Sequence, residues 1–478
     1  MDEYQVLFDF VTNVLFVTVL GWYLITNLQW YDYRLSRVVL KHHKPLWHLL
    51  YFFIPLIAYY TTAQFFAIFF YFAYLPSVFV WHKKLDKKLI LTWRVKRFLI
   101  LLVSLTLFQD VLCTLKSACE LYGVFIPLAI AYIGSYLIEK FLFETFKKQA
   151  KAKLTAMDNL QIIAITGSYG KTSIKNFLTE ILSYKYKVYA TPRSVNTLGG
   201  IIRDVNESLP EDTQIYICEA GARESGDIYN ITTFIEPQTV VVGKVGLAHI
   251  EYFQSIENII ATKLEIMQSP RLENAYIHNS VTDEVHQKVT FFGDGVSEID
   301  ATLKGTDFRV DGMQLHTDVL GSFQTMNIEV AIKIAQQFGL SIDEIVKAVR
   351  KLTPVEHRLQ LIKAGGKMIL DDGYNGNIDG MLEGIRLCSL HEGGHRVIVT
   401  PGLVESSQEL NLKLIKAIND TFDIVIVTGT LNAQLFDKHL DVKQKTILHD
   451  KSKITNILAS QTKAGDIILF ANDAPNFI

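Results

Sequence analysis

The feature that most constrains the fold is a run of 36 residues, Leu46 to Trp81, that contains no Asp, Glu, Lys or Arg. As one helix this run would be about 54 Å long, whereas the hydrocarbon core of a bilayer is about 30 Å thick. Two shorter helices joined near residues 61–64 fit a membrane better than one long helix. Further apolar stretches predict spans at residues 6–28, 98–115 and 124–143. Residues 1–145 are therefore predicted to form a transmembrane helical region with about five spans.

Basic residues predict which side of the membrane the ends of these spans face. They gather in three segments, residues 34–44, 83–97 and 147–153, and the positive-inside rule assigns all three to the cytoplasm. An even number of crossings must then separate each pair of segments, and two and two spans satisfy this. With the acidic Asp2 and Glu3 outside, everything after about residue 145 lies in the cytoplasm. Four spans with a re-entrant or interfacial segment, and a buried all-helical soluble domain, remain as alternatives.

A phosphate-binding loop is predicted after the apolar region. A short apolar strand leads into the sequence TGSYGKTS, and a helical pattern follows to Tyr184. In such a loop, glycines let backbone N–H groups close on phosphate oxygens, a lysine neutralises the β/γ charge, and a hydroxyl can ligate Mg²⁺. The nucleotide-binding residues predicted here are Thr166, Gly167, Ser168, Gly170, Lys171, Thr172 and Ser173. The alternative is an ordinary glycine-rich turn.

Strands and helical segments alternate after this loop, which is typical of a doubly wound, mostly parallel α/β sheet with its site at the carboxyl ends of the strands. One buried strand ends in Glu219, where a magnesium ligand belongs beside a phosphate loop. The next strand leads to a loop with His249, and a helix over residues 256–267 carries Lys263. Taken alone, a histidine on a loop and a lysine on a helix are more often ordinary surface residues.

Two domains are predicted within residues 146–478. Short strands with Gly and Asp turns over residues 289–320 indicate a small antiparallel extension, and two helices broken at Gly339 follow. Pro354 lies in a candidate linker, after which strands and helices alternate again. The later strands are expected at residues 368–370, 397–400, 424–428 and 467–470. The expected boundaries are 146–354 for a central ATP-binding domain and 355–478 for a smaller, Rossmann-like α/β domain.

Composition argues against two other kinds of site. The net charge of −2 gives no basic field of the kind that nucleic-acid-binding proteins carry, so no nucleic-acid partner is expected. The cysteines have none of the short spacings that a zinc site uses. All four, Cys113, Cys119, Cys218 and Cys388, are expected to be reduced.

The order of these motifs resembles the Mur ligase family, ATP-dependent enzymes that join an amino acid or short peptide to a carboxylate. Five sites match in order: TGSYGKTS, Asn196 in the loop that follows, Glu219 in CEAG, His249 in GLAH with Lys263 after it, and HRLQ followed by DDGYNGN. Within the family, the DDGYNGN segment most resembles the members that add D-alanyl-D-alanine to UDP-N-acetylmuramoyl-tripeptide in peptidoglycan biosynthesis.

The resemblance implies ATP and Mg²⁺ as cofactors, and an acyl phosphate formed on the substrate carboxylate. It implies that Thr172 and Glu219 hold one magnesium ion. It also implies that His249 and Lys263, the latter as a carbamate, hold a second. The implied catalytic residues are Lys171, His249 and Lys263. The implied nucleotide-side residues are Asn196, Asn327, Arg358 and Asp372, with Tyr374, Asn375 and Asn377 toward the dipeptide or the adenine.

The chain departs from the family in one large respect, because predicted spans occupy the place of the N-terminal domain that holds the UDP-sugar. The expected location is a bacterial inner (cytoplasmic) membrane, with the catalytic domains in the cytoplasm. The expected partners are the two substrates, the lipid bilayer and other cell-wall synthesis proteins. Two alternatives remain. One is a membrane-located ligase of this family that acts on a lipid-linked or other carboxylate, and the other is a membrane scaffold that binds ATP without turnover.

Overall fold

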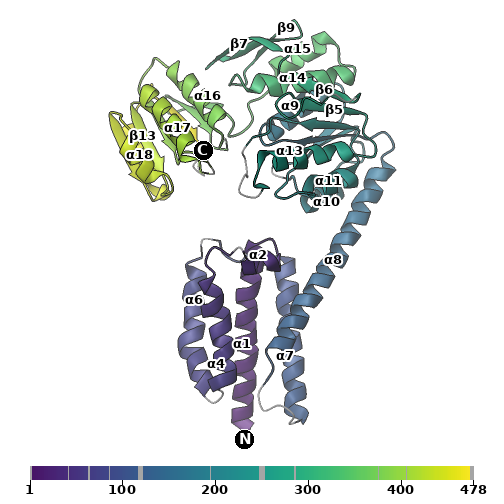
Figure 1. Ribbon diagram of the computed structural model, residues 1–478, viewed down its shortest axis with the longest axis vertical. Helices are drawn as coiled ribbons and strands as arrows, with labels where there is room; N and C mark the ends of the chain where they lie inside the picture. The colour runs from purple at the N-terminus through teal and green to yellow at the C-terminus, as the bar shows by residue number, and fades with distance from the viewer. Residues whose placement is uncertain are drawn as a thin grey trace. The chain divides into compact units, whose positions relative to one another are not determined.

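The computed structural model describes most of the chain, which divides into two compact units, residues 1–146 and 147–478 (Figure 1). The described residues are 3–40, 42–62, 65–85, 87–116, 122–193, 195–246, 253–284, 287–374, 376–404 and 406–473. His249 and Asn375, which the sequence marks as site residues, lie outside them.

The first unit is built from helices (Figure 1). Among the described residues, three helices are long and apolar enough to cross a membrane, within α1 (Glu3–Trp30), α7 (Trp93–Lys116) and α8 (Phe125–Ala156). The uncharged run folds as two shorter helical stretches. They comprise α3 (Leu46–His48), η1 (Leu49–Phe53) and α4 (Ile54–Thr62), then α5 (Phe66–Phe69), η3 (Phe70–Tyr74) and α6 (Leu75–Lys83). A short helix, α2 (Leu35–Leu40), follows α1.

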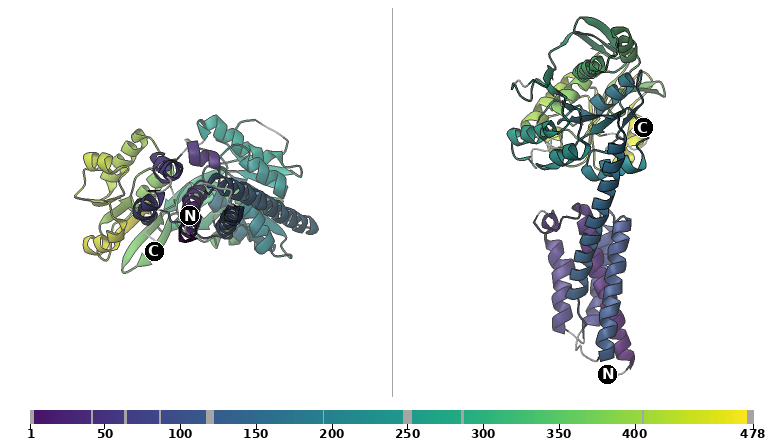
Figure 2. Two further views of the ribbon diagram at one scale, coloured as in Figure 1. Left: turned by 90° about the horizontal axis from the view of Figure 1, so that it is seen from below. Right: turned by 90° about the vertical axis from the view of Figure 1, so that its right-hand side faces the viewer.

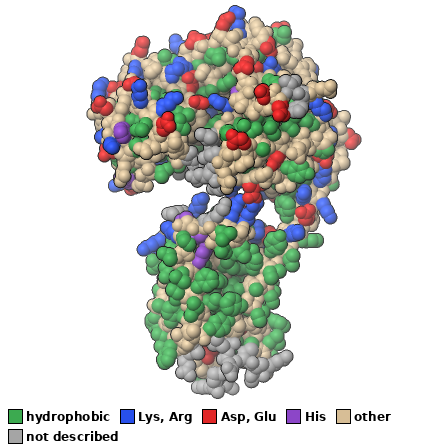
Figure 3. Space-filling view, viewed as in Figure 1, with side chains coloured by type: hydrophobic (Ala, Val, Ile, Leu, Met, Phe, Trp, Pro, Cys, Tyr) green, Lys and Arg blue, Asp and Glu red, His purple; other side chains and the backbone are tan. Residues whose placement is uncertain are grey.

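Apolar side chains fill the inside of this unit and also cover its outside. Phe16 and Leu20 of α1 are fully buried in one core with Phe70 and Phe98. Hydrophobic side chains also cover much of the outer surface of this unit (Figure 3). Phe72, for example, is 82% exposed. In water, an apolar surface of this extent would be costly, since soluble monomers expose only small contiguous apolar patches.

One expectation about the cysteines is wrong. Cys113, near the end of α7, is disulfide-bonded, whereas Cys218 and Cys388 are free and buried, as expected. Cys119 lies outside the described residues. The spacing of the cysteines along the chain bears on zinc binding, but it does not predict which of them form a disulfide.

The second unit contains a six-stranded sheet in the order β2-β3-β1-β4-β5-β6, with every neighbouring pair parallel. Its strands are β1 (Gln161–Thr166), β2 (Val188–Ala190), β3 (Ile215–Glu219), β4 (Thr239–Val242), β5 (Asn274–His278) and β6 (Val289–Phe292). Successive side chains of a strand point to opposite faces. Accordingly, Ile163 and Ile165 enter one core while Ile162 and Ala164 enter the other. Both faces are buried, and this explains the continuous apolar sequence of β1.

Helices cover both faces of this sheet (Figures 1 and 2). One core contains residues of α9 (Lys171–Leu182), α14 (Gln324–Gln337) and α15 (Ile342–Arg350). The other contains residues of α10 (Leu198–Glu207), α11 (Asp227–Ile235) and α13 (Ile256–Leu264), which runs on into η4 (Glu265–Gln268). Ala150 and Leu154, in the last turns of α8, belong to this second core. The prediction of a doubly wound parallel sheet is confirmed.

A three-stranded antiparallel sheet follows, made of β7 (Val296–Thr302), β8 (Gly305–Val310) and β9 (Met313–Thr317). This confirms the predicted extension in outline. The prediction is wrong for the start of that segment, because β6 pairs in parallel with β5. Phe292 of β6 is 2% exposed in the same core as β1, so burial of this apolar segment places it in the main sheet.

The C-terminal part carries a second six-stranded sheet in the order β10-β11-β15-β12-β13-β14. Only the β10–β11 pair is antiparallel. Its strands are β10 (Gln360–Ala364), β11 (Lys367–Asp372), β12 (Arg396–Thr400), β13 (Ile424–Thr428), β14 (Gln444–Leu448) and β15 (Ile467–Ala471). Its helices are α16 (Ile378–Ser389), α17 (Gln408–Thr421), α18 (Ala433–His439), η5 (Lys451–Lys453) and α19 (Ile454–Gln461). A second α/β domain is thus confirmed, and within this sheet the sequence pattern did not reveal β10 and β14.

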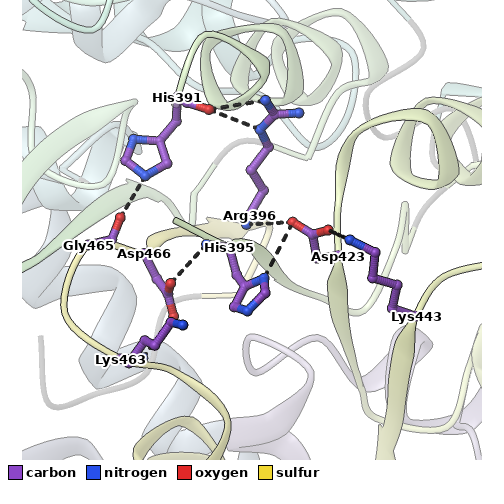
Figure 4. Close-up of polar contacts among 8 residues, drawn as sticks. All are labelled: His391, His395, Arg396, Asp423, Lys443, Lys463, Gly465 and Asp466. Atoms are coloured by element: carbon purple, nitrogen blue, oxygen red, sulfur yellow. Dashed lines mark hydrogen bonds and ion pairs between the residues drawn. The ribbon is translucent and has the colours of Figure 1, made fainter. Parts of the chain in front are cut away.

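Polar contacts fasten the amino ends of these strands (Figure 4). Asp423 accepts from the backbone N–H of Arg396 at 3.1 Å and pairs with Lys443 at 2.6 Å. Asp466 accepts from the backbone N–H groups of His395 and Lys463 at 2.8 and 2.7 Å. The predicted site residues lie at the other edge of the sheet, at the carboxyl end of β11. The contacts at the amino ends are therefore away from the site, and they stabilise the turns that lead into the strands.

Candidate active site

The predicted phosphate loop lies between β1 and α9, and its two glycines are required by the geometry. Gly167 and Gly170 have φ angles of 145° and 80°, which L-residues rarely adopt. A Cβ on Gly167 would lie 3.1 Å from the backbone of Gly243, and a Cβ on Gly170 would lie 2.6 Å from Oδ1 of Asn327. The loop can therefore pack closely against Gly243 and Asn327 because these two glycines have no side chains.

The backbone N–H groups of the loop divide into two sets. Those of Ser168 and Tyr169 donate to the backbone oxygen of Lys244 at 3.0 and 3.1 Å, so they hold the loop to the strand β4 side. The first bond of helix α9 runs from Ile174 N–H to the Gly170 oxygen. The N–H groups at the start of α9 precede this bond, and at a helix N-terminus such groups are available to an anion.

The side chain of Lys171 folds back over the loop. Its Nζ donates to the backbone oxygens of Gly167 and Ser168 at 2.8 and 3.2 Å. Burial lowers the pKa of Lys171, the nearby Arg358 acts in the same direction, and Glu219 opposes both. A cation poised over a helix N-terminus is suited to the terminal phosphates of a nucleotide.

Glu219 ends β3 beside the loop, because β3 pairs with β1 and places Glu219 opposite Ile165. Its Oε2 accepts a 3.2 Å hydrogen bond from the hydroxyl of Thr172. Two ligands of an octahedral Mg²⁺ at about 2.1 Å and at right angles would be about 3 Å apart. The hydroxyl of Thr172 and the carboxylate of Glu219 are therefore close enough to reach one Mg²⁺ together, as the first predicted metal site requires.

A buried cation at the same carboxylate was missed by the sequence reasoning. Nζ of Lys175 lies 3.3 Å from Oε2 of Glu219, and both side chains are almost fully buried. The available signal was its position one helical turn after Lys171 on the inward face of α9.

Asn327 lies beside the phosphate loop, and Asn196 lies beside the residues that follow β3. The backbone oxygen of Asn196 accepts from Gly221 N–H at 2.8 Å, immediately after β3. The side chain of Asn327, from α14, faces Gly170 and donates to Oε1 of Gln324 at 2.9 Å.

Lys263 lies on α13 and is 4% exposed. Burial lowers its pKa to about 7, the charge of Lys171 adds to the shift, and Glu265 and Asp227 oppose it. Its predicted metal partner, His249, is outside the described residues. Among the residues that are described, no group of three or more His, Cys, Asp and Glu side chains is arranged to hold a metal ion.

Arg358 enters from the start of the C-terminal part and is flanked by strained backbone. His357 and Leu359, on either side, have φ angles of 60° and 51°, a left-handed conformation that costs non-glycine residues free energy. Leu359 N–H donates to Oδ1 of Asp372 at 3.1 Å, and His357 Nδ1 lies 2.6 Å from Oδ2 of Asp371. Burial lowers the pKa of Arg358, and the charges of Asp372 and Glu219 oppose this.

The remaining predicted residues are less central. Tyr374 is 61% exposed, and its ring lies 4.5 Å from that of His357. Asn377 caps α16, because its side-chain oxygen accepts a hydrogen bond from Gly380 N–H at 2.8 Å. This oxygen therefore has a structural role. Lys244 forms a 2.9 Å ion pair with Asp379 at the start of α16.

Fold and site together define a P-loop nucleotide-binding protein with a second α/β domain. A protein-family model, the Mur ligase middle domain, matches residues 165–335, and that segment contains the phosphate loop, Glu219, Lys263 and Asn327. Residues 165–335 therefore form a Mur ligase middle domain, and the structure has the fold of a solved Mur ligase.

Named relatives and solved structures agree with this family. The chain is 27% identical over 345 residues to UDP-N-acetylmuramoyl-tripeptide–D-alanyl-D-alanine ligase of Bacillus subtilis, covering 67% of this chain and 74% of that enzyme. It is 29% identical to the enzyme of the same name from Mycobacterium leprae, covering 52% of this chain but only 54% of that relative. The structure of MurF ligase from Thermotoga maritima in complex with ADP superposes with a TM-score of 0.60 at 25% identity, covering 69% of this chain and 80% of that one.

Proposed function

We propose that this protein is an ATP-dependent, ADP-forming ligase of peptidoglycan precursor synthesis. It adds D-alanyl-D-alanine to the stem-tripeptide carboxylate of UDP-N-acetylmuramoyl-tripeptide through an acyl phosphate. The observation that carries the proposal is the placement of Lys171, Thr172 and Glu219 at one phosphate loop, with the Thr172 hydroxyl 3.2 Å from the carboxylate. The choice of substrates is supported by the similarity to ligases of that name.

The chemistry requires cations, since a carboxylate must approach a triphosphate that repels it. Lys171 and the N-terminus of α9 offset the charge of the phosphates, and Arg358 adds a guanidinium charge from the C-terminal domain. Thr172 and Glu219 would hold one Mg²⁺, which would offset the negative charge of the phosphoryl oxygens and make the γ-phosphorus more electrophilic. The substrate carboxylate attacks the γ-phosphate, ADP leaves, and the amine of the dipeptide then displaces phosphate from the acyl phosphate.

Lys263 needs a change of charge before it can serve a metal. An ammonium group repels Mg²⁺, whereas a neutral amine can take up carbon dioxide as a carbamate, which has carboxylate-like oxygens. Burial that lowers the pKa of Lys263 to about 7 favours the neutral amine. In this proposal Lys263, as a carbamate, and His249 would hold the second Mg²⁺.

The other predicted residues receive roles on the nucleotide side. Asn196, Asn327, Arg358 and Asp372 orient the nucleotide and its phosphates. Tyr374, which is largely exposed, is proposed to face the dipeptide or the adenine together with Asn375 and Asn377. Asn377 can contribute only through the part of its side chain that does not cap α16.

We also propose that the ligase is anchored in the cytoplasmic membrane through residues 1–145, with the catalytic domains in the cytoplasm. Three helices of sufficient length and apolarity support this location. Orientation is supported by the two ends of α7, which begins beside Arg94, Lys96 and Arg97 and carries the disulfide-bonded Cys113 near its other end. Disulfides persist mainly outside the cytoplasm, and basic residues favour its inside.

Cysteine labelling tests this orientation. In intact cells, a membrane-impermeant maleimide should label a Tyr4→Cys chain and should label Lys87→Cys only after permeabilisation. The reverse pattern would place the catalytic unit outside and refute the proposed location.

The candidate spans favour one alternative acceptor, a lipid-linked carboxylate in the same membrane. Phosphate release by the detergent-solubilised chain decides between the soluble nucleotide and a lipid-linked acceptor. ATP, Mg²⁺, UDP-N-acetylmuramoyl-tripeptide and D-alanyl-D-alanine are omitted one at a time. Release that needs both substrates and yields the pentapeptide supports the proposal. No release with the soluble nucleotide, together with turnover of a lipid-linked acceptor, supports the alternative. ATP binding without turnover of any acceptor would indicate a scaffold.

A further inference from the structure

Lys175 is a buried cation to which the proposed mechanism assigns no role. It lies on α9, one turn after Lys171, and its side chain is 3% exposed. Its Nζ lies 3.3 Å from Oε2 of Glu219. The same Nζ donates a 3.0 Å hydrogen bond to the backbone oxygen of Arg193. Lysines are almost never this buried unless they are paired with an opposite charge. The buried pair with Glu219 therefore needs an explanation.

Two donors meet at one oxygen of the Glu219 carboxylate. Oε2 accepts from the hydroxyl of Thr172 at 3.2 Å and also lies against the ammonium of Lys175. Within the described ranges, no side chain donates a hydrogen bond to the other oxygen, Oε1. A carboxylate that is held through one oxygen in this way keeps its second oxygen for another cation.

The hydrogen bond to Arg193 extends this arrangement to the loop between β2 and α10. That loop carries Asn196, whose backbone oxygen accepts from Gly221 N–H at 2.8 Å just after β3. One ammonium group therefore connects the phosphate-loop helix, the end of β3 and the Asn196 loop.

We infer that Lys175 is a positioning residue, which orients the Glu219 carboxylate and the Asn196 loop for a complex of Mg²⁺ with a nucleotide. The inference rests on the proposed function only in taking Mg²⁺ and nucleotide phosphates as the ligands, because the acceptor substrates have no part in it. Removing a group that orients a metal ligand commonly changes metal affinity by about 10- to 100-fold.

Lys175→Met tests the inference, since methionine is unbranched, fills much of the same space and carries no charge. Calorimetric titration of the full-length chain in detergent with ADP, in Mg²⁺ and in EDTA, gives the gain in affinity that Mg²⁺ provides. We expect Lys175→Met to reduce this gain tenfold or more. A merely structural role would weaken ADP binding equally in both buffers.

A matched control is Lys185→Met. Lys185 also donates to a backbone oxygen, that of Gly339 at 2.7 Å, but it is exposed and lies beyond the end of α9. This variant should leave the Mg²⁺-dependent gain at the wild-type value. A reduction of threefold or more in Lys175→Met, absent in the control, supports the inference, and a smaller reduction overturns it.

If Lys175→Met does not fold, the double variant Lys175→Met/Glu219→Gln decides. It removes both members of the ion pair, so it should fold if Lys175 acts by balancing Glu219. A double variant that also fails to fold overturns the inference. A wild-type chain that binds ADP with Mg²⁺ but does not ligate D-alanyl-D-alanine would refute the proposed function and leave the inference standing. Absence of any Mg²⁺-dependent gain in the wild type would overturn the inference.

Discussion

Replacing Lys263 by alanine should abolish ligation, and short carboxylates should restore part of it. The structure supplies the magnitude, because burial lowers the pKa of Lys263 from 10.5 to about 7. At pH 7.5, the neutral fraction of the amine rises from about 0.1% at the unperturbed pKa to about three quarters at the lowered one, a gain of several hundred-fold. Only the neutral amine can form the carbamate that turns this position into a metal ligand.

The assay is release of phosphate from ATP by the solubilised chain with both substrates present. Lys263→Ala should reduce the rate by at least 100-fold, the order expected when an electrostatic contribution to the transition state is lost. Formate should raise the rate of this variant because its carboxylate can occupy the vacated space. The exposed Lys288, whose Nζ donates to the backbone oxygen of Leu272, supplies a control, and Lys288→Ala should retain wild-type activity. Unchanged ATP turnover in Lys263→Ala, without any effect of formate, would refute the two-metal reasoning.

Four further outcomes are expected. The wild type should gain stability relative to Lys263→Met between pH 7 and 10, because the lowered pKa means that the folded state binds fewer protons than the unfolded state in this window; parallel denaturant midpoints across this range would contradict it. Glu219→Gln should raise the Mg²⁺ concentration needed for half-maximal ADP binding by about tenfold or more, because it weakens a charged ligand, and titration calorimetry checks this. Arg358→Ala should lower kcat/KM for ATP by about 10²-fold or more, and steady-state kinetics that match the wild type would exclude Arg358 from the site. Ile163→Ala, in the fully buried centre of β1, should lower the free energy of unfolding by about 2–5 kcal/mol, measured by denaturant unfolding of the solubilised chain.

The sequence contained the local features of the fold because they depend on neighbouring residues. The continuous apolar sequence of β1, the glycines of the loop and the helical pattern of α9 predicted a strand, a loop and a helix, and the structure has them. Charge and apolarity likewise predicted helices throughout residues 1–145. The edge strands β10 and β14 were missed because QLIKA and QKTIL are partly polar. Their strand conformation depends on pairing with a neighbour in the sheet.

The amino-acid sequence by itself determined which residues form the phosphate loop and which acid ends the next strand, because turn geometry and strand burial are local constraints. Only the tertiary structure decided that Lys175 reaches that acid, that Lys244 uses two of the loop's N–H groups, and that burial lowers the pKa of Lys263. These features depend on distances between segments far apart in the chain and on the exclusion of water. No pattern of residues along the chain specifies either of them.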